Sequence, residues 1–347
     1  MSLVNVHNEW GQLEEVIVGI ARNAHVPLID KGLYEIEYRD YYKNPFDIET
    51  GLYPAQVRDE AEEDLEILVD TLHSLRITVR RPKEVDYSKF FGTPDWKSSG
   101  NYNYCPRDSM LAIGNTIIET PMPLRARYFE TFAYKDILID YLKSESRWIS
   151  APKPCLPDDT YRTGNKYWNI LANKEPLFDA ANVLRVGRDL LYLISGSGNE
   201  LGAKWLQSTL GSQYTVHICR DMYAGTHIDS TITFLRPGLV LLNPSRVNEN
   251  NLPPILRNWD KLWAPEMVDI GYHGKKPYSS LWVGMNFLMV NEQLAIVEQK
   301  QKPLIQLLNR FGIEVIPLQL RHALTLGGGF HCVTLDIRRQ GTLESYI

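Results

Sequence analysis

The chain has 347 residues, of which 44% are hydrophobic and 23% are charged, and its formal net charge is −5. This composition excludes an intrinsically disordered or collagen-like protein, and the length is sufficient for a large hydrophobic core. The sequence contains no long run of Lys and Arg, so we expect no nucleic-acid partner.

Signals that would direct the chain to a membrane or out of the cell are not visible in the sequence. The N-terminal stretch MSLVNVHNEWGQLEE lacks the basic start and apolar centre of a signal peptide, and no apolar run approaches the roughly 18 residues of a membrane span. The four cysteines, Cys105, Cys155, Cys219 and Cys332, are widely separated, which argues against a disulfide framework or a structural zinc site. We therefore expect a cytoplasmic protein with no membrane partner.

Five segments of the chain show the same order, in which a helical pattern is followed by a short turn and a strand pattern. The clearest begins with the charged amphipathic stretch Arg58–Leu75 and continues into the strand pattern Ile77–Arg81. The other helix–strand pairs are 132–143 with 147–152, 199–211 with 214–220, 253–259 with 260–265, and 302–312 with 313–320. The pair at 253–265 has the weakest helical pattern.

Predicted β-hairpins separate these helix–strand pairs. β-Favouring residues flank turn residues at Gly114-Asn115, Gly187-Arg188, Pro237-Gly238 and Asn291-Glu292. The N-terminal stretch 4–21 supplies a fifth pair of short strands. Five hairpin–helix–strand units predict a single α/β domain over residues 1–347, with the units arranged around an axis. An open doubly wound sheet is the alternative, but it requires strict βαβ alternation, which the hairpins interrupt.

Reactive side chains lie next to the predicted hairpins and at the start of the last strand. They are Asp108 in CPRDS, Asp179 in LFDAAN, His227 and Asp229 in GTHIDST, and Cys332 in GGGFHCVT. Because strand ends and loops converge where units surround an axis, we expect these side chains to meet in a central cleft.

Each of these residues also has a purely structural interpretation. A single cysteine is more often a small core residue than a nucleophile, His227 has a hydrogen-bonded core histidine as its default, and Asp179 could cap a helix. The glycine triplet before Cys332 favours a site, because glycine lets backbone approach a ligand closely. The triplet could also form a phosphate cradle, but the sequence there lacks the GK[ST] ending of a P-loop. A metal site of His227, Asp229, His331 and Cys332 matches zinc-ligand spacing poorly.

A thiol, an imidazole and several carboxylates suit a planar cationic substrate. A cysteine thiolate attacks an electrophilic carbon, and a histidine moves a proton to and from the leaving group. Carboxylates around a thiol would repel an anion, but they pair bidentately with a guanidinium.

At these residues the sequence resembles the amidinotransferases of the guanidine-modifying (pentein) superfamily. The motifs that carry the resemblance are PRD (106–108), FDAAN (178–182), HID (227–229), NPSR (243–246) and GGGFHC (327–332). The resemblance extends over essentially the whole chain. SLVNVHNEW, FDAANVLR, SGNELGAKWLQS and RPGLVLLNPSRVN are similar to the branch of the family that acts on inosamine phosphates in streptomycin-type aminocyclitol biosynthesis.

The resemblance implies a fold and a set of roles. The family's fold is a five-bladed α/β propeller of ββαβ modules with pseudo-fivefold symmetry. Cys332 would be the nucleophile, His227 the general acid and base, and Asp179 its partner. Four further residues are implied to bind substrate. They are Asp108 and Asp229, which would hold the donor's guanidinium, Arg246, which would bind the donor's carboxylate, and Arg127, which falls on a family position.

The expected function follows from the same resemblance. The amidino group of L-arginine would move through an amidino-cysteine to a primary amine, an inosamine phosphate such as scyllo-inosamine 4-phosphate, with release of L-ornithine. The expected partners are small-molecule substrates and a possible homodimer, and no metal or organic cofactor is implied. Glycine or lysine as acceptor, an arginine deiminase-type hydrolase and an inactive arginine-binding propeller are the alternatives. Gly284 stands where the glycine-using relative has serine, so we expect a roomier acceptor pocket.

Overall fold

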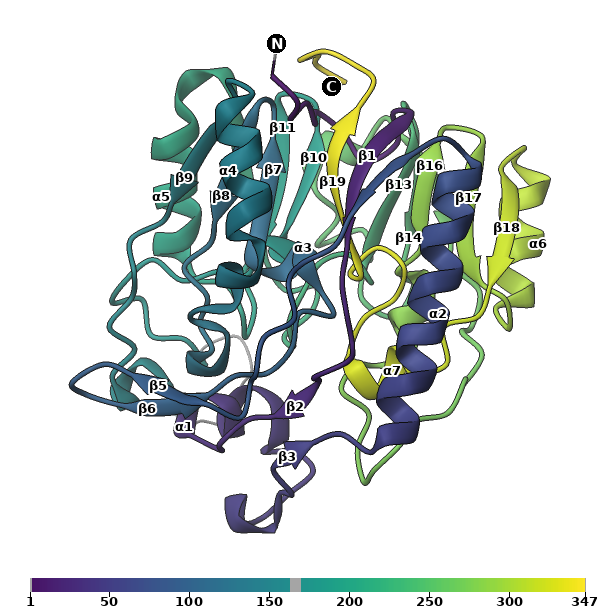
Figure 1. Cartoon of the computed structure of the whole chain (residues 1–347). Helices are drawn as coiled ribbons and strands as arrows, with labels where there is room; N and C mark the ends of the chain where they lie inside the picture. Colours follow the sequence, from purple (N-terminus) through teal and green to yellow (C-terminus); the bar gives the residue numbers. More distant parts are fainter. Residues whose placement is uncertain (1, 163–169, 347) are drawn as a thin grey trace.

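Small sheets of three strands recur along residues 2–162 and 170–346, which are the residues that the computed structural model describes (Figure 1). Five such sheets occur in this part of the chain, and they share one pattern. In each, the middle strand pairs antiparallel with one neighbour and parallel with the other. The α/β class is therefore confirmed. Both ends of the predicted domain 1–347, and its segment 163–169, lie outside the described residues.

The strands and helices have the following bounds. With the middle strand second, the sheets are β19 (Thr334–Arg339), β1 (Leu13–Val18) and β4 (Thr78–Arg80); β7 (Met110–Ile113), β8 (Thr116–Glu119) and β9 (Arg147–Ser150); β10 (Val183–Val186), β11 (Asp189–Leu193) and β12 (Thr215–Cys219); β13 (Ile232–Arg236), β14 (Leu239–Leu242) and β15 (Asp260–Trp263); and β16 (Leu288–Asn291), β17 (Leu294–Glu298) and β18 (Glu314–Leu318). Two short pairs are β2 (His25–Val26) with β3 (Gly51–Leu52), and β5 (Phe90–Gly92) with β6 (Lys97–Ser99). The α-helices are α1 (Lys31–Leu33), α2 (Ala55–Ser74), α3 (Pro106–Ser109), α4 (Lys135–Lys143), α5 (Glu200–Leu210), α6 (Lys302–Arg310) and α7 (Ala323–Leu326).

Four of the five predicted helix–strand pairs are confirmed. Helices α2, α4, α5 and α6 each precede the third strand of a sheet, and they lie at the periphery of the sheets in Figure 1. The weak pattern at 253–259 forms a single 3₁₀ turn, Pro254–Leu256, before β15. Pro253 and Pro254 both lack a backbone N–H donor, and too few residues follow them for a longer helix. No helix in the described part of the chain has both the length and the hydrophobicity to cross a lipid bilayer.

The predicted N-terminal strand pair is wrong. β1 pairs antiparallel with β19, from the far end of the chain, rather than with a strand before it. Residues Asn5, Val6 and Asn8 make isolated bridges to Arg338, to the β7–β8 turn and to β10. The alternation of apolar residues shows which faces of a strand are buried, but it does not identify the strand's partner. The remaining four hairpins are confirmed, with their turns at or next to the predicted positions.

Helix α2 shows how the outer helices are attached. Leu65, Leu68 and Leu72 recur at the spacing of one helix face, and all three are fully buried. Burial of each such leucine contributes about 1.5–3 kcal/mol. Glutamates and aspartates occupy much of the opposite face, which is exposed to solvent.

A buried network of charged side chains joins the first and last segments of the chain to α3 and β10. Asp336 in β19 pairs with Arg107 at 2.8 Å, Arg185 at 3.0 Å and Arg339 at 2.9 Å. Glu9 holds the guanidinium of Arg185 bidentately at 2.8 and 2.7 Å. Burial disfavours the charged form of Asp336, but the three surrounding guanidinium groups hold the pKa of its carboxyl well below the usual range. Each charge in the network is thus neutralised locally, as a buried ion requires.

We predict that Asp336→Asn will lower the free energy of unfolding by about 3–5 kcal/mol, because it leaves buried guanidinium charge uncompensated. The matched control is Asp136→Asn, which breaks an exposed ion pair with Lys83 at 2.5 Å and should cost less than about 1 kcal/mol. Urea unfolding of the unmodified protein and of the two variants measures these free energies of unfolding. Similar small losses for both variants would show that the network does not stabilise the fold.

Candidate active site

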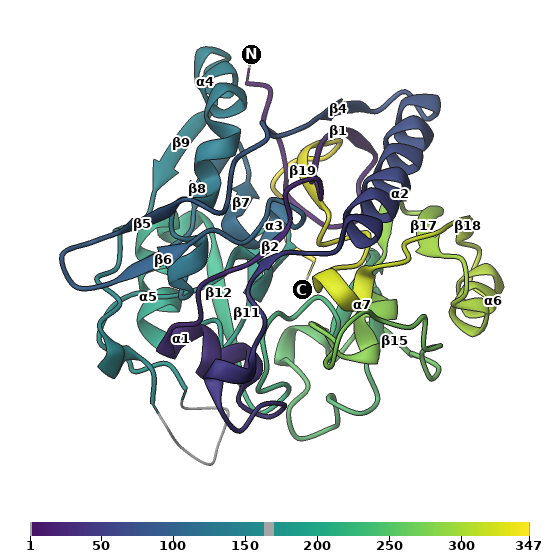
Figure 2. The ribbon, with the colours of Figure 1, turned by 60° about the horizontal axis from the view of Figure 1, so that its bottom comes forward.

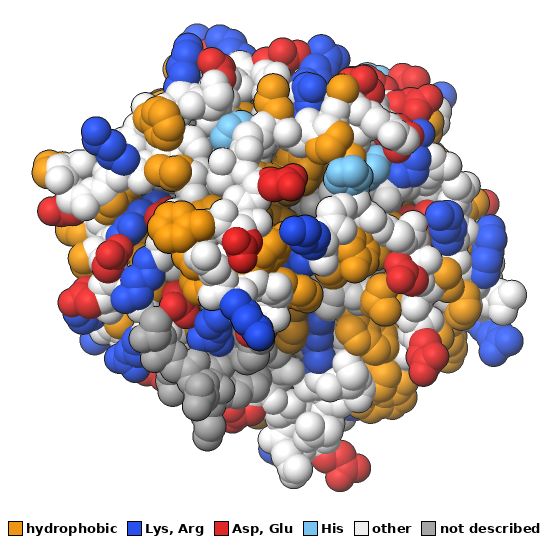
Figure 3. Space-filling view, turned by 90° about the horizontal axis from the view of Figure 1, so that it is seen from below, with side chains coloured by type: hydrophobic (Ala, Val, Ile, Leu, Met, Phe, Trp, Pro, Cys, Tyr) orange, Lys and Arg blue, Asp and Glu red, His pale blue; other side chains and the backbone are white. Residues whose placement is uncertain are grey.

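A cleft of about 310 Å³ brings together the reactive residues that the sequence singled out. Asp108, Asp179, His227, Asp229 and Cys332 all line it, and they come from four units of the chain, because His227 and Asp229 share one loop. Residues that follow α1 also line the cleft. They lie in the lower part of the molecule in Figure 1, which is turned toward the viewer in Figure 2. Figure 3 shows this side of the molecule, where acidic and basic side chains lie close together among hydrophobic ones.

Cys332 lies in the loop between α7 and β19, and the glycines before it serve close packing. A Cβ on Gly328 would lie 2.5 Å from Cys105 Sγ and 2.9 Å from Cys332 Cβ, and one on Gly329 would collide with the main-chain oxygen of Asn286. The Cys332 N–H donates to Asn286 Oδ1 at 2.9 Å. Gly328 and Gly329 therefore pack against protein atoms around the thiol, which argues against the phosphate cradle.

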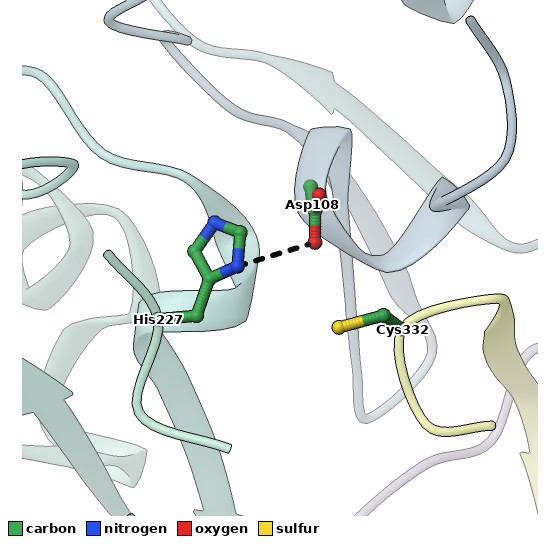
Figure 4. A group of neighbouring side chains, drawn as sticks. All are labelled: Asp108, His227 and Cys332. Carbon is green, nitrogen blue, oxygen red and sulfur yellow. Dashed lines mark ion pairs between the residues drawn. The ribbon is translucent and has the colours of Figure 1, made fainter. Parts of the chain in front are cut away.

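His227 lies between two carboxylates, in the loop between β12 and β13. Its Nε2 is 2.8 Å from Asp179 Oδ2, and its Nδ1 is 3.7 Å from Asp108 Oδ1 (Figure 4). Burial opposes the charged imidazolium, but Asp108 and the hydrogen bond with Asp179 raise the pKa of His227 well above its ordinary value. Asp179 precedes a 3₁₀ turn, yet its side chain does not cap that turn. The pairing with His227 thus replaces the helix-cap interpretation.

Asp229 also contacts the thiol. Its Oδ2 is 3.4 Å from Cys332 Sγ and 2.9 Å from His331 Nδ1, and His331 Nε2 is 3.3 Å from Glu9. Burial disfavours the Asp229 carboxylate, but the hydrogen bond from His331 lowers its pKa. The hydrogen bond with Cys105, burial and the Asp229 charge together raise the pKa of Cys332 well above its ordinary value. The surroundings of the thiol therefore disfavour the thiolate form.

The two predicted arginines have different positions. Arg127 lines the cleft, and its guanidinium is bonded to Glu130 at 2.6 and 2.7 Å and to Asp108 Oδ2 at 2.7 Å. This contact orients Asp108 and leaves its other oxygen, Oδ1, without a hydrogen-bond partner among the described residues. The equivalent oxygen of Asp179 is likewise buried and unpartnered there.

Arg246 lies behind the cleft wall. Its guanidinium donates to the hydroxyls of Ser230 at 2.9 Å, Thr231 at 3.0 Å and Ser280 at 2.7 Å, and it lies 3.5 Å from the centroid of the Tyr223 ring. Ser230, Ser280 and Tyr223 line the cleft, although Arg246 itself does not. Burial lowers the pKa of Arg246. Its partners among the described residues are neutral, so its charge is available to an anionic group held by those hydroxyls.

The expectation for Gly284 is wrong. Gly284 lines a separate small cavity, and a Cβ there would meet Met267 Sδ at 2.6 Å and Gln301 Cδ at 2.9 Å. In this 3₁₀ turn, Leu281–Met285, Val283 contributes to the cleft and Gly284 does not. The glycine therefore does not widen the cleft that contains Cys332.

The cluster in Figure 4 also has the dimensions of a metal site. One ligand atom each from Asp108, His227 and Cys332 lie within 4.8 Å of one another. This set differs from the His227, Asp229, His331 and Cys332 set considered from the sequence, because His331 is engaged by Asp229 and Glu9. The same closeness allows proton exchange between a thiol and an imidazole.

Other residues of the cleft were not expected from the sequence. Asn101, Asn286, Glu37 and Lys276 all line it, and Asn101 Oδ1 is buried without a hydrogen-bond partner in the described part of the chain. None of these residues belongs to a recognisable local motif. Their positions depend on contacts between distant segments, which a single sequence does not reveal.

Comparison with known proteins identifies relatives of the whole chain. No model of a protein family matches the sequence. "Inosamine-phosphate amidinotransferase 1" of Streptomyces glaucescens is 56% identical over 346 residues, which cover 100% of this chain and 99% of that protein. The protein of the same name from Streptomyces griseus is 57% identical over 339 residues, with 98% of each chain covered. The solved structure of an inosamine-phosphate amidinotransferase from Streptomyces griseus matches with a TM-score of 0.98 at 56% identity, covering 100% of this chain and 99% of that one. The chain belongs to the amidinotransferase family.

Proposed function

We propose that the chain transfers the amidino group of L-arginine to an inosamine phosphate, scyllo-inosamine 4-phosphate, and releases L-ornithine. The observation that carries the proposal is the meeting of a cysteine, a histidine and three aspartates in one cleft, namely Cys332, His227, Asp108, Asp179 and Asp229. The names of the relatives at 56% and 57% identity support the inosamine phosphate as acceptor.

The donor's guanidinium fits the negative charge of the cleft. Asp108 and Asp229 both lie near Cys332, and in our proposal both pair with the planar cation. The buried, unpartnered Oδ1 of Asp108 would gain a donor on binding. The substrate's positive charge would also offset the Asp229 carboxylate that disfavours a thiolate, so arginine would promote ionisation of its own nucleophile, with the thiol proton released to solvent and His227 remaining protonated.

The first half-reaction requires one proton on the leaving amine. The Cys332 thiolate forms a bond to the guanidino carbon, and the bond from that carbon to the ornithine nitrogen breaks. His227, whose raised pKa favours the imidazolium, gives its proton to the departing amine. The products are L-ornithine, a neutral imidazole and an amidino-cysteine. Asp179 would act as a positioning residue, since it holds His227 at 2.8 Å.

The second half-reaction reverses these steps with a different amine. The acceptor nitrogen attacks the amidino carbon, His227 accepts its proton, and the Cys332 thiolate leaves. If water attacked the amidino-cysteine instead, the product would be urea. Citrulline would form only if ammonia, rather than ornithine, left in the first half-reaction and water then attacked, as in an arginine deiminase-type hydrolase. Exclusion of water from the cleft therefore determines whether transfer or hydrolysis follows.

Further roles belong to the same proposal. Arg246, with Ser230 and Ser280, would bind the carboxylate of L-arginine, because it is a buried cation bonded only to neutral groups among the described residues. Arg127 would act through Asp108, whose Oδ2 it holds. We also propose that the five sheets are the blades of a propeller within one domain. The five repeats of one strand pattern support this arrangement.

The proposed function predicts the products of a simple incubation. With L-arginine and scyllo-inosamine 4-phosphate, ornithine should form together with a guanidinylated acceptor, and Cys332→Ala should form neither. Ornithine release driven by glycine or lysine alone would keep the mechanism and change the acceptor. Citrulline as the main product without an amine would contradict the transferase and indicate a hydrolase. Arginine binding without turnover would indicate an inactive propeller.

We predict that His227→Gln will lower the rate of amidino transfer by about 10²–10⁴-fold, because both half-reactions need its proton. His217→Gln is a matched control, since His217 forms a similar pair with Asp189 at 2.6 Å but does not line the cleft. The control variant should retain nearly full activity. Equal losses in the two variants, or activity in His227→Gln close to that of the unmodified protein, would contradict the role of His227.

A further inference from the structure

Lys276 is a buried cation in the wall of the cleft. Its side chain is 5% exposed. Lys276 and Tyr278 line both the cleft and a neighbouring cavity of about 240 Å³, so this wall separates two hollows. A lysine in such a position is unusual, because burial of an ammonium without a counter-ion is costly.

Tyrosine rings surround the ammonium of Lys276. Its Nζ lies 4.3 Å from the ring centroid of Tyr38, 4.4 Å from that of Tyr278 and 5.3 Å from that of Tyr41. These contacts stabilise a cation through the negative ring faces. They accept no conventional hydrogen bond, so they leave the N–H donors of the ammonium available.

The described residues accept hydrogen bonds from only some of the three N–H donors of Lys276. Its Nζ donates to the main-chain oxygen of Glu37, and the Glu37 carboxylate lies at 3.7 Å, which is too long for a hydrogen bond. An ammonium has three N–H donors. Even if the Glu37 carboxylate is counted, a third donor remains for a ligand.

Burial also disfavours the charged forms of both Lys276 and Glu37. Burial lowers the pKa of Lys276, although Glu37 opposes this effect. Burial raises the pKa of Glu37, with Lys276 opposing. A bound anion would add negative charge beside the ammonium and so favour the charged form of Lys276.

The other cations of the described cleft lining are engaged elsewhere. Arg127 is held by Glu130 and Asp108. Arg39 pairs with Glu35 at 3.3 Å and lies 3.8 Å from Asp40. Among the lysines and arginines that line the cleft in the described residues, Lys276 is therefore the best placed to receive a new anion.

We propose that Lys276 binds the phosphate group of the acceptor. This inference rests on the proposed function, which makes the acceptor an aminocyclitol phosphate. Asp108, Asp179 and Asp229 would repel a phosphate near the thiol, whereas they attract an amine. The two charges of the acceptor would therefore orient it with its amine toward Cys332 and its phosphate toward Lys276. Lys276 would then select phosphorylated acceptors over glycine or lysine.

The test compares two acceptors, scyllo-inosamine 4-phosphate and unphosphorylated scyllo-inosamine, in Lys276→Met. We expect the KM for the phosphorylated acceptor to rise about tenfold to a hundredfold, which is the range for losing a charged hydrogen bond. The KM for the unphosphorylated amine, and formation of the amidino-enzyme from L-arginine alone, should stay within about twofold. Lys276→Arg should restore part of the preference for phosphate. Lys275→Met, which alters a neighbouring lysine that lines only the second cavity, should leave that preference unchanged.

Inorganic phosphate provides a second readout. It should compete with the phosphorylated acceptor in the unmodified protein, and weaker competition is expected in Lys276→Met. Equal losses for both acceptors, or a loss of amidino-enzyme formation, would assign Lys276 a structural role and overturn the inference while the proposed function stands. If the unmodified protein transfers to neither acceptor but does transfer to glycine or lysine, the proposed acceptor and the inference fail together.

Discussion

The ion network around Asp336 links the position of the thiol to the position of the carboxylate that faces it. Arg107, one residue before Asp108, pairs with Asp336 and donates from its Nε to the main-chain oxygens of His331 and Thr334 at 2.7 and 2.9 Å. These residues flank Cys332. The distance between the nucleophile and Asp108 is therefore fixed by charges buried beneath both, rather than by flexible loops. Glu9 extends the same support through His331 to Asp229.

The hydrogen-bonding groups of the cleft are incompletely satisfied within the described residues. Asp108 and Asp179 each bury an oxygen without a hydrogen-bond partner there, and the surroundings of Cys332 raise the pKa of its thiol. A structure selected for stability alone would pair these groups, because an unsatisfied buried acceptor costs about 1–3 kcal/mol. In our proposal a guanidinium supplies the missing donors and the missing positive charge together. The positive charge of the guanidinium would then both hold the substrate in the cleft and favour ionisation of the Cys332 thiol.

Local signals were sufficient for much of the fold and for the reactive residues of the cleft, but not for contacts between distant segments. Turn residues and alternating apolar residues located four hairpins, and the motifs around Asp108, Asp179, His227 and Cys332 located part of the lining of the cleft. The pairing of β1 with β19 was missed, since the alternation within a strand does not identify its partner. Whether position 284 faces the cleft depends on the geometry of one 3₁₀ turn. The burial of Lys276 depends on Tyr38 and Tyr278, which come from two segments of the chain. Neither leaves a pattern in the neighbouring sequence.

The most direct test of a covalent transfer through Cys332 is the mass of the intact protein after incubation with L-arginine alone. The proposed mechanism predicts a gain of one amidino group on each chain, with one ornithine released, and no gain in Cys332→Ala. The adduct should disappear when scyllo-inosamine 4-phosphate is added. An unchanged mass while the guanidinylated acceptor still forms would show direct transfer between substrates, and it would contradict Cys332 as the carrier.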